Sequence, residues 1–98
     1  MDLVVYPSIA LKLKDKHRVL VDEVKQAFLN RSGRLAREMR PQNQGSFPRY
    51  WFISETDTGR RLKVVFVHDP DESGPVIITA YEPNSKEEIL YASITQGR

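Results

Sequence analysis

Few side chains in this chain of 98 residues could carry acid–base chemistry. There is no cysteine, which excludes disulfides, thiolate metal sites and thiol nucleophiles, and there are two histidines. His17 stands in Lys16-His17-Arg18 and is either a capping or packing residue or a general acid or base for phosphoryl transfer. His68 precedes the Asp-Pro-Asp-Glu segment 69–72, which indicates a solvated turn. Because no GxSxG, P-loop, HExxH or GxGxxG motif is present, any catalytic site must combine distant residues.

One such combination could cleave RNA without a metal ion or cofactor. Attack by the neighbouring 2′-hydroxyl needs a proton acceptor, a proton donor for the leaving oxygen, and cations that stabilise the phosphorane. His17, Glu82 or a lysine could be the acceptor, and Tyr81 could donate or position. Arg61 and Lys63 could hold the phosphate. We therefore predict a catalytic set of His17, Lys63, Tyr81 and Glu82, with no bound metal.

The charge distribution favours a polyanionic partner. The net charge is +2, but residues 1–50 contain ten Lys and Arg against five Asp and Glu, whereas residues 51–98 contain five against eight. The excess is mostly arginine, which suits two-point contact with phosphate. The alternative is a solvated, irregular segment. The arginines predicted to bind RNA from this region are Arg34, Arg37, Arg40 and Arg49.

The hydrophobic pattern predicts an α+β fold in a single domain, residues 1–98. Residues 49–56, 61–68 and 76–82 are rich in β-branched and aromatic residues and are separated by turn sequences, which is typical of an antiparallel meander. We expect two N-terminal helices, one with Ser8 as its N-cap that runs to about Lys16 and one from about Asp22 to Asn30. A C-terminal helix should follow Asn84.

Two further predictions concern residues 34–40 and the C-terminal helix. Residues 34–40 fit either a helix or an edge strand, and we favour the strand, which gives a twisted sheet of three to four strands. Ser85 and Glu88 have capping-box spacing at the start of the C-terminal helix. The residues of that helix expected to face inward are Ile89, Leu90 and Ile94.

The meander can also be assigned faces, given a four-residue loop at 57–60. One face then carries the apolar core, namely Trp51, Ile53, Leu62, Val64 and Phe66. The other carries basic and aromatic groups, namely Tyr50, Phe52, Ser54, Arg61 and Lys63. A cationic, aromatic sheet face is suited to single-stranded nucleic acid, so Tyr50, Phe52 and Arg61 join the predicted RNA-binding residues. The alternative is a second hydrophobic layer under a helix, with Lys63 extending to solvent.

The order of short motifs resembles one known family. Lys16-His17-Arg18-Val19 followed by Asp22-Glu23-Val24 resembles the Lys-His-Gly-Val … Glu-Glu-Ala junction of BrnT-like toxins, of the RelE-type ribonuclease superfamily. Arg49 and the segments 59–66 and 76–82 follow in that family's order, so the resemblance covers about residues 10–90. It implies a compact α+β domain whose sheet cleaves RNA and which an antitoxin neutralises. The family's glycine is Arg18 here, and its terminal Ser-Ala-Arg-basic sequence is 79–82, Thr-Ala-Tyr-Glu.

Together these features predict a toxin-like RNA-binding protein, a metal-independent endoribonuclease if the site is active, with RNA and an antitoxin-like protein as partners. The alternative is a non-catalytic module that binds a protein through its sheet face or edge. No apolar run approaches the ~18 residues that span a membrane, and no signal peptide is visible, so we expect a cytoplasmic protein. Oligomeric state is left open.

Overall fold

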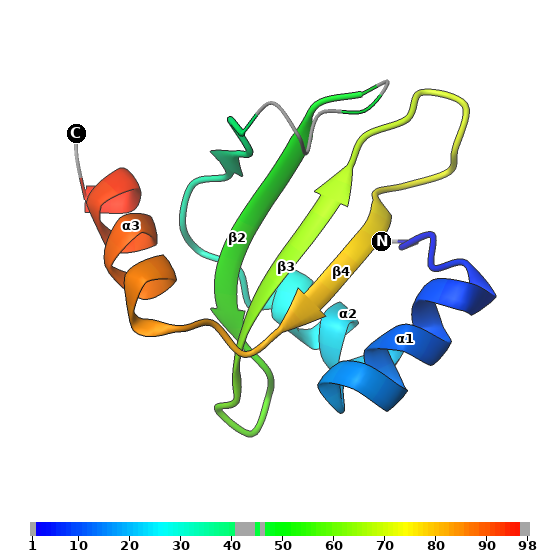
Figure 1. The fold of residues 1–98 in the computed structure, drawn as a ribbon, viewed down its shortest axis with the longest axis horizontal. Coiled ribbons are helices and arrows are strands. Elements are labelled where there is room, and N and C mark those ends of the chain that lie inside the picture. The colour runs from blue at the N-terminus through cyan, green and yellow to red at the C-terminus, as the bar shows by residue number, and fades with distance from the viewer. Residues whose placement is uncertain (1, 41–44, 46, 97–98) are drawn as a thin grey trace.

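The computed structural model describes residues 2–40, 45 and 47–96, which form an antiparallel sheet and three helices (Figure 1). The elements are α1 (Pro7–His17), α2 (Val21–Leu29), β1 (Ala36–Arg37), β2 (Arg49–Glu55), β3 (Arg61–Val67), β4 (Val76–Tyr81) and α3 (Ser85–Gln96). The four strands are ordered β1-β2-β3-β4. This confirms the predicted α+β fold with two N-terminal helices and one C-terminal helix. No helix among the described residues is long and apolar enough to cross a membrane.

The N-terminal helices begin and end for local reasons. Pro7 occupies the first turn of α1, where its missing N–H costs nothing, so the N-cap is Tyr6 and not the predicted Ser8. Its C-cap is Arg18, whose φ of 57° is left-handed. In α2 the carboxylate of Glu23 accepts a hydrogen bond from the Leu20 N–H at 3.0 Å. Of the stripe predicted to be buried, Val24 and Phe28 are buried together with Ala27, whereas Val21 is only partly buried.

The meander forms, but its register differs by one residue from the prediction. Thr56 pairs with Arg60 through an N–H···O bond of 2.9 Å, so the connection is a three-residue loop with Gly59 at φ 90°. Three-residue hairpin loops with a left-handed glycine are common. Ile53 therefore lies opposite Lys63, and Phe52 opposite Val64. Because successive side chains alternate, this slip moves β3 to the opposite faces relative to β2.

The predicted face assignments are wrong as a result. Lys63 shares a face with Trp51, whereas Tyr50 and Phe52 share the other face with Phe66. Phe52 is fully buried, and its ring lies 4.8 Å from that of Phe28 in α2. Lys63 and Tyr50 therefore do not share a face as predicted. Bases cannot stack on Phe52, because α2 covers the face that carries it.

Helix α3 packs on the face that carries Trp51. The capping box forms one residue earlier than predicted: the Glu87 N–H donates to Asn84 Oδ1 at 2.9 Å, and the Asn84 N–H donates to Glu87 Oε1 at 3.0 Å. Tyr91 is buried, with its ring centre 5.6 Å from that of Trp51. Of the residues expected to face inward, Ile94 is partly buried, but Ile89 and Leu90 are 70% and 52% exposed. The contacts of Glu87 and Tyr91 set the orientation of the helix.

A short strand forms one edge of the sheet, and a single backbone bridge extends the other. The predicted strand over 34–40 is reduced to β1, in which Ala36 lies opposite Trp51. At the other edge Val4 makes an isolated parallel bridge to β4, donating to the Pro75 carbonyl at 2.8 Å. Figure 1 shows α1 next to β4 and α3 next to β2. The ends of α1 and β4 thereby come together.

Candidate nucleic-acid site

The structure brings His17 and Tyr81 into contact. His17 is the last residue of α1 and Tyr81 the last of β4, and their ring centres lie 5.5 Å apart. They line an open cavity of about 530 Å³. The residues around it are Lys16, His17, Arg18, Arg60, Tyr81 and Glu82. Three of the predicted catalytic residues, His17, Tyr81 and Glu82, therefore share one cavity.

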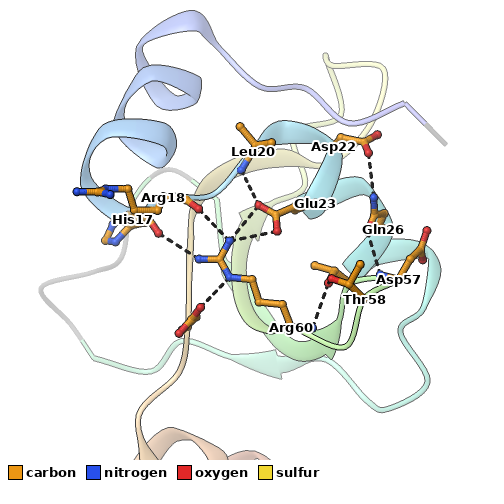
Figure 2. A network of polar contacts seen from close by, with 11 residues as sticks. His17, Arg18, Leu20, Asp22, Glu23, Gln26, Asp57, Thr58 and Arg60 are labelled. Atoms are coloured by element: carbon orange, nitrogen blue, oxygen red, sulfur yellow. Dashed lines mark hydrogen bonds and ion pairs between the residues drawn. The ribbon is translucent and has the colours of Figure 1, made fainter.

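Arg60 joins the elements that form this cavity (Figure 2). Its Nε donates to Glu82 at 2.7 Å, and its Nη1 donates to Glu23 in α2 at 3.0 Å. Nη1 also donates to the Arg18 carbonyl at 2.8 Å, and Nη2 to the His17 carbonyl at 3.4 Å. Hydrogen bonds to Glu82 and Glu23 raise the pKa of Arg60 against the effect of burial. The guanidinium is thus a charged cross-link between α1, α2 and the end of β4.

Arg60 was not among the residues predicted from the sequence, and Glu82 was predicted as a proton acceptor. The carboxylate of Glu82 is engaged by Arg60, so it is better suited to holding the cavity together than to accepting a proton from RNA. The signal that could have found Arg60 is the three-residue loop ending at Gly59. With that loop, Arg60 lies on the face toward α2 and Arg61 on the face toward α3.

The ionisation states of His17 and Tyr81 suit acid–base chemistry. Burial lowers the pKa of His17 from its ordinary 6.5, and the positive charges of Lys16 and Lys12 lower it further. Its imidazole is therefore neutral at pH 7 and can accept a proton. Burial raises the pKa of Tyr81 above 10.0, as does its hydrogen bond to Glu87. Tyr81 is consequently a neutral phenol under the same conditions.

Lys63 lies near Tyr81 but does not line this cavity. Its Nζ donates to Glu87 Oε2 at 2.9 Å and lies 5.7 Å from the centre of the Tyr81 ring. It also lies 4.5 Å from the centre of the Trp51 ring, and its side chain is only 7% exposed. The predicted convergence of Lys63 with His17 and Glu82 on one phosphate is therefore not formed in this structure.

Two carboxylates of α3, those of Glu87 and Glu88, contact Lys63 and Arg61. Burial acts to raise the pKa of Glu87, but hydrogen bonds from Lys63, the Asn84 backbone and Tyr81 outweigh it, so the pKa is lowered. Arg61 donates to both carboxylate oxygens of Glu88, at 3.1 and 2.8 Å. This two-point contact lowers the pKa of Glu88. Arg61 is thus placed with Lys63, as predicted, but beneath α3.

The predicted arginine cluster lies at the β1 edge, away from the His17 cavity. Arg37 is exposed in β1, and Arg49 opens β2, which is paired with it. Arg40 donates to both oxygens of Glu38, the shorter bond being 2.7 Å. The Arg34 carbonyl accepts from the Tyr91 hydroxyl at 2.9 Å. None of these four arginines lines the His17 cavity, whereas Arg37 and Arg40 line the cavity beside α3 together with Lys63 and Glu87.

The comparisons with known proteins leave the family open. No protein-family model matches the chain, and no curated protein matches it either. The resemblance to BrnT-like toxins stays a prediction based on the motifs quoted above. Within the described part of the chain, no group of three or more His, Asp or Glu side chains could hold a metal ion.

The geometry of Arg18 bears on one of those motifs. Its φ of 57° is the conformation that favours glycine, and Arg18 stands where the BrnT-like motif has glycine. The bend lets the next residue, Val19, donate to the Leu13 carbonyl at 2.9 Å and enter the core. Arginine at this position accepts backbone strain and adds a positive charge at the rim of the cavity.

Proposed function

We propose that this chain is a toxin-like RNA-binding protein that cleaves RNA at the His17 cavity without a metal ion. The observation that carries the proposal is a histidine of lowered pKa in an open cavity that two exposed cations, Lys16 and Arg18, also line. A neutral imidazole accepts protons, and the cations attract a phosphodiester. The position of Tyr81 against His17 limits the orientation of the imidazole.

In the proposed reaction, His17 is the one catalytic residue. The imidazole of His17 takes the proton of the ribose 2′-hydroxyl, and the 2′-oxygen forms a bond to phosphorus. The bond from phosphorus to the 5′-oxygen then breaks, leaving a 2′,3′-cyclic phosphate. The 5′-oxygen takes a proton from water, and the imidazolium returns its proton to the resulting hydroxide. Lys16 and Arg18 offset the charge of the phosphorane, while Arg60 and Tyr81 are positioning residues.

The test is cleavage of a single-stranded oligoribonucleotide in the presence of a metal chelator. His17→Ala should reduce the rate by roughly 10²–10⁴ while leaving RNA affinity largely intact. His68→Ala is the matched control, because His68 is exposed after β3 and lies outside the cavity. The product should carry a 2′,3′-cyclic phosphate. Absence of cleavage by the unchanged protein, or equal rates for both variants, would refute the proposal.

A second candidate function is protein binding beside α3. Met39 and Leu90 are 73% and 52% exposed and line a cavity of about 600 Å³ that also reaches Trp51. Exposed apolar side chains at such a cavity are typical of protein contacts. Binding of this kind would be insensitive to salt and would be lost in Leu90→Asp. RNA binding would weaken with salt and would persist in that variant.

A further inference from the structure

The sheet face beneath α3 combines cations with aromatic rings. Lys63 and Arg61 project from β3 on this face, together with Trp51 from β2 and Tyr81 from β4. The Lys63 ammonium lies over both rings, 4.5 Å from the centre of Trp51 and 5.7 Å from that of Tyr81. Positive charge beside aromatic rings is the combination that binds single-stranded nucleic acid. We call these four residues the α3-covered face.

Both cations of the α3-covered face contact carboxylates from the first turn of α3. Glu87 Oε2 accepts from Lys63 at 2.9 Å and from the Tyr81 hydroxyl at 2.7 Å. Glu88 accepts two bonds from Arg61, at 2.8 and 3.1 Å. A guanidinium contacts a phosphate group with the same two-point geometry, and an ammonium binds either anion. The two carboxylates therefore occupy the positions where phosphate oxygens would bind.

The remaining attachment of α3 is limited. Tyr91 is the buried apolar residue among those described in α3, and it packs against Trp51. Leu90 and Ile94 line the cavity of about 600 Å³ between α3 and the sheet, rather than filling it. Because this cavity is open to solvent, it leaves few apolar contacts beneath the helix, and the two ion pairs contribute a large share of the contact. Helix α3 is thus suited to displacement by a competing anion.

We propose that α3 is an internal competitor for RNA: Glu87 and Glu88 stand in for phosphates on the α3-covered face, and single-stranded RNA displaces them. This inference rests on the proposed function, because it extends the RNA from the His17 cavity across Tyr81 onto Lys63 and Arg61. Tyr81 belongs to both surfaces, since its ring contacts His17 and also lies near the Lys63 ammonium.

The experiment compares Glu87→Gln/Glu88→Gln with a matched control, Asp2→Asn/Asp71→Asn. Glutamine keeps the acceptor that caps the Asn84 N–H, and the control changes the net charge equally. Both control carboxylates are exposed and form no hydrogen bond or ion pair with the described residues. The probe is a single-stranded 2′-O-methyl oligoribonucleotide, which lacks the attacking hydroxyl and stays intact. Inorganic polyphosphate is the second probe.

We expect the glutamine variant to bind the oligonucleotide on the order of tenfold more tightly than the control, since two competing ion pairs are removed. Its log–log salt dependence should steepen by about 1.4, or about 0.7 for each new phosphate contact. The single tryptophan, Trp51, should become more accessible to acrylamide. Glu88→Gln alone, which retains the Lys63–Glu87 pair, should give about half of the change in slope.

The outcomes separate this inference from the proposed function. If RNA binds the unchanged protein but the glutamine variant binds no more tightly than the control, α3 is not a competitor, and RNA binding stands. If none of the three proteins binds RNA but polyphosphate binds the glutamine variant more tightly than the control, then α3 competes with a polyanion and RNA is the wrong ligand. Equal binding of both probes to both variants overturns the inference.

Discussion

Lys63 and Tyr81 donate hydrogen bonds to the same oxygen, Oε2 of Glu87, at 2.9 and 2.7 Å. This shared acceptor joins β3, β4 and α3 at one point, where the Lys63 side chain is 7% exposed and that of Glu87 is 19% exposed. A buried ion pair of this kind contributes little relative to an apolar pair, but it is costly to break on one side.

We therefore expect Lys63→Met to lower the free energy of unfolding by about 2 kcal/mol, because it leaves the Glu87 carboxylate with one donor fewer. Lys63→Met combined with Glu87→Leu should cost less than Lys63→Met alone. Chemical denaturation of the three proteins measures this. A double variant as unstable as the sum of both single changes would show that the two side chains act independently.

Acid should weaken the attachment of α3. The unfolded carboxyl groups of Glu87 and Glu88 have a pKa near 4.5, and folding lowers the pKa of each. Their contribution to stability is therefore present above pH 4.5 and is lost as pH falls through the lower, folded values. The free energy of unfolding should decline over that range, and less steeply in Glu87→Gln/Glu88→Gln. If the free energy of unfolding declined equally in Asp71→Asn and in Glu87→Gln/Glu88→Gln, protonation of Glu87 and Glu88 would not be the cause.

Titration of His17 should have its midpoint below 6.5, because burial and neighbouring lysines disfavour the imidazolium. Lys16→Gln should raise the midpoint toward 6.5 without reaching it, since burial is the larger cause. NMR titration of the ring protons measures both. If His17 is the base, the acid limb of the cleavage rate should move with the same midpoint, whereas a purely structural histidine would leave the pH profile unchanged.

Arg18→Gly should separate stability from RNA binding. Glycine adopts the φ of 57° without strain, and the relief of about 1–2 kcal/mol is partly offset by the greater freedom of glycine in the unfolded chain. We expect a small rise in melting temperature together with weaker RNA binding, because one cation leaves the cavity. Arg18→Val should lower stability, since a β-branched residue tolerates this conformation poorly. A fall in stability for Arg18→Gly would show that the arginine side chain itself supports the turn.

The types and order of the elements could be predicted from sequence because their signals are local. Alternating β-branched and aromatic residues with a glycine-containing turn identified β2 and β3, and the apolar stripe of Val24 and Phe28 identified α2. His17, Tyr81 and Glu82 were grouped on chemical type alone, and all three line one cavity in the structure. Their proximity could not be derived, because it depends on how the end of α1 packs beside the end of β4.

The tertiary structure decided which faces those local elements present. A loop of three residues instead of four, ending at Gly59, placed Lys63 with Trp51 and aimed Arg60 rather than Arg61 at the His17 cavity. Local propensity differs little between the two loop lengths, whereas side-chain direction reverses completely, because strand side chains alternate with a period of two. The burial of Phe52 under α2 and the ion pairs under α3 favour the register that the protein adopts.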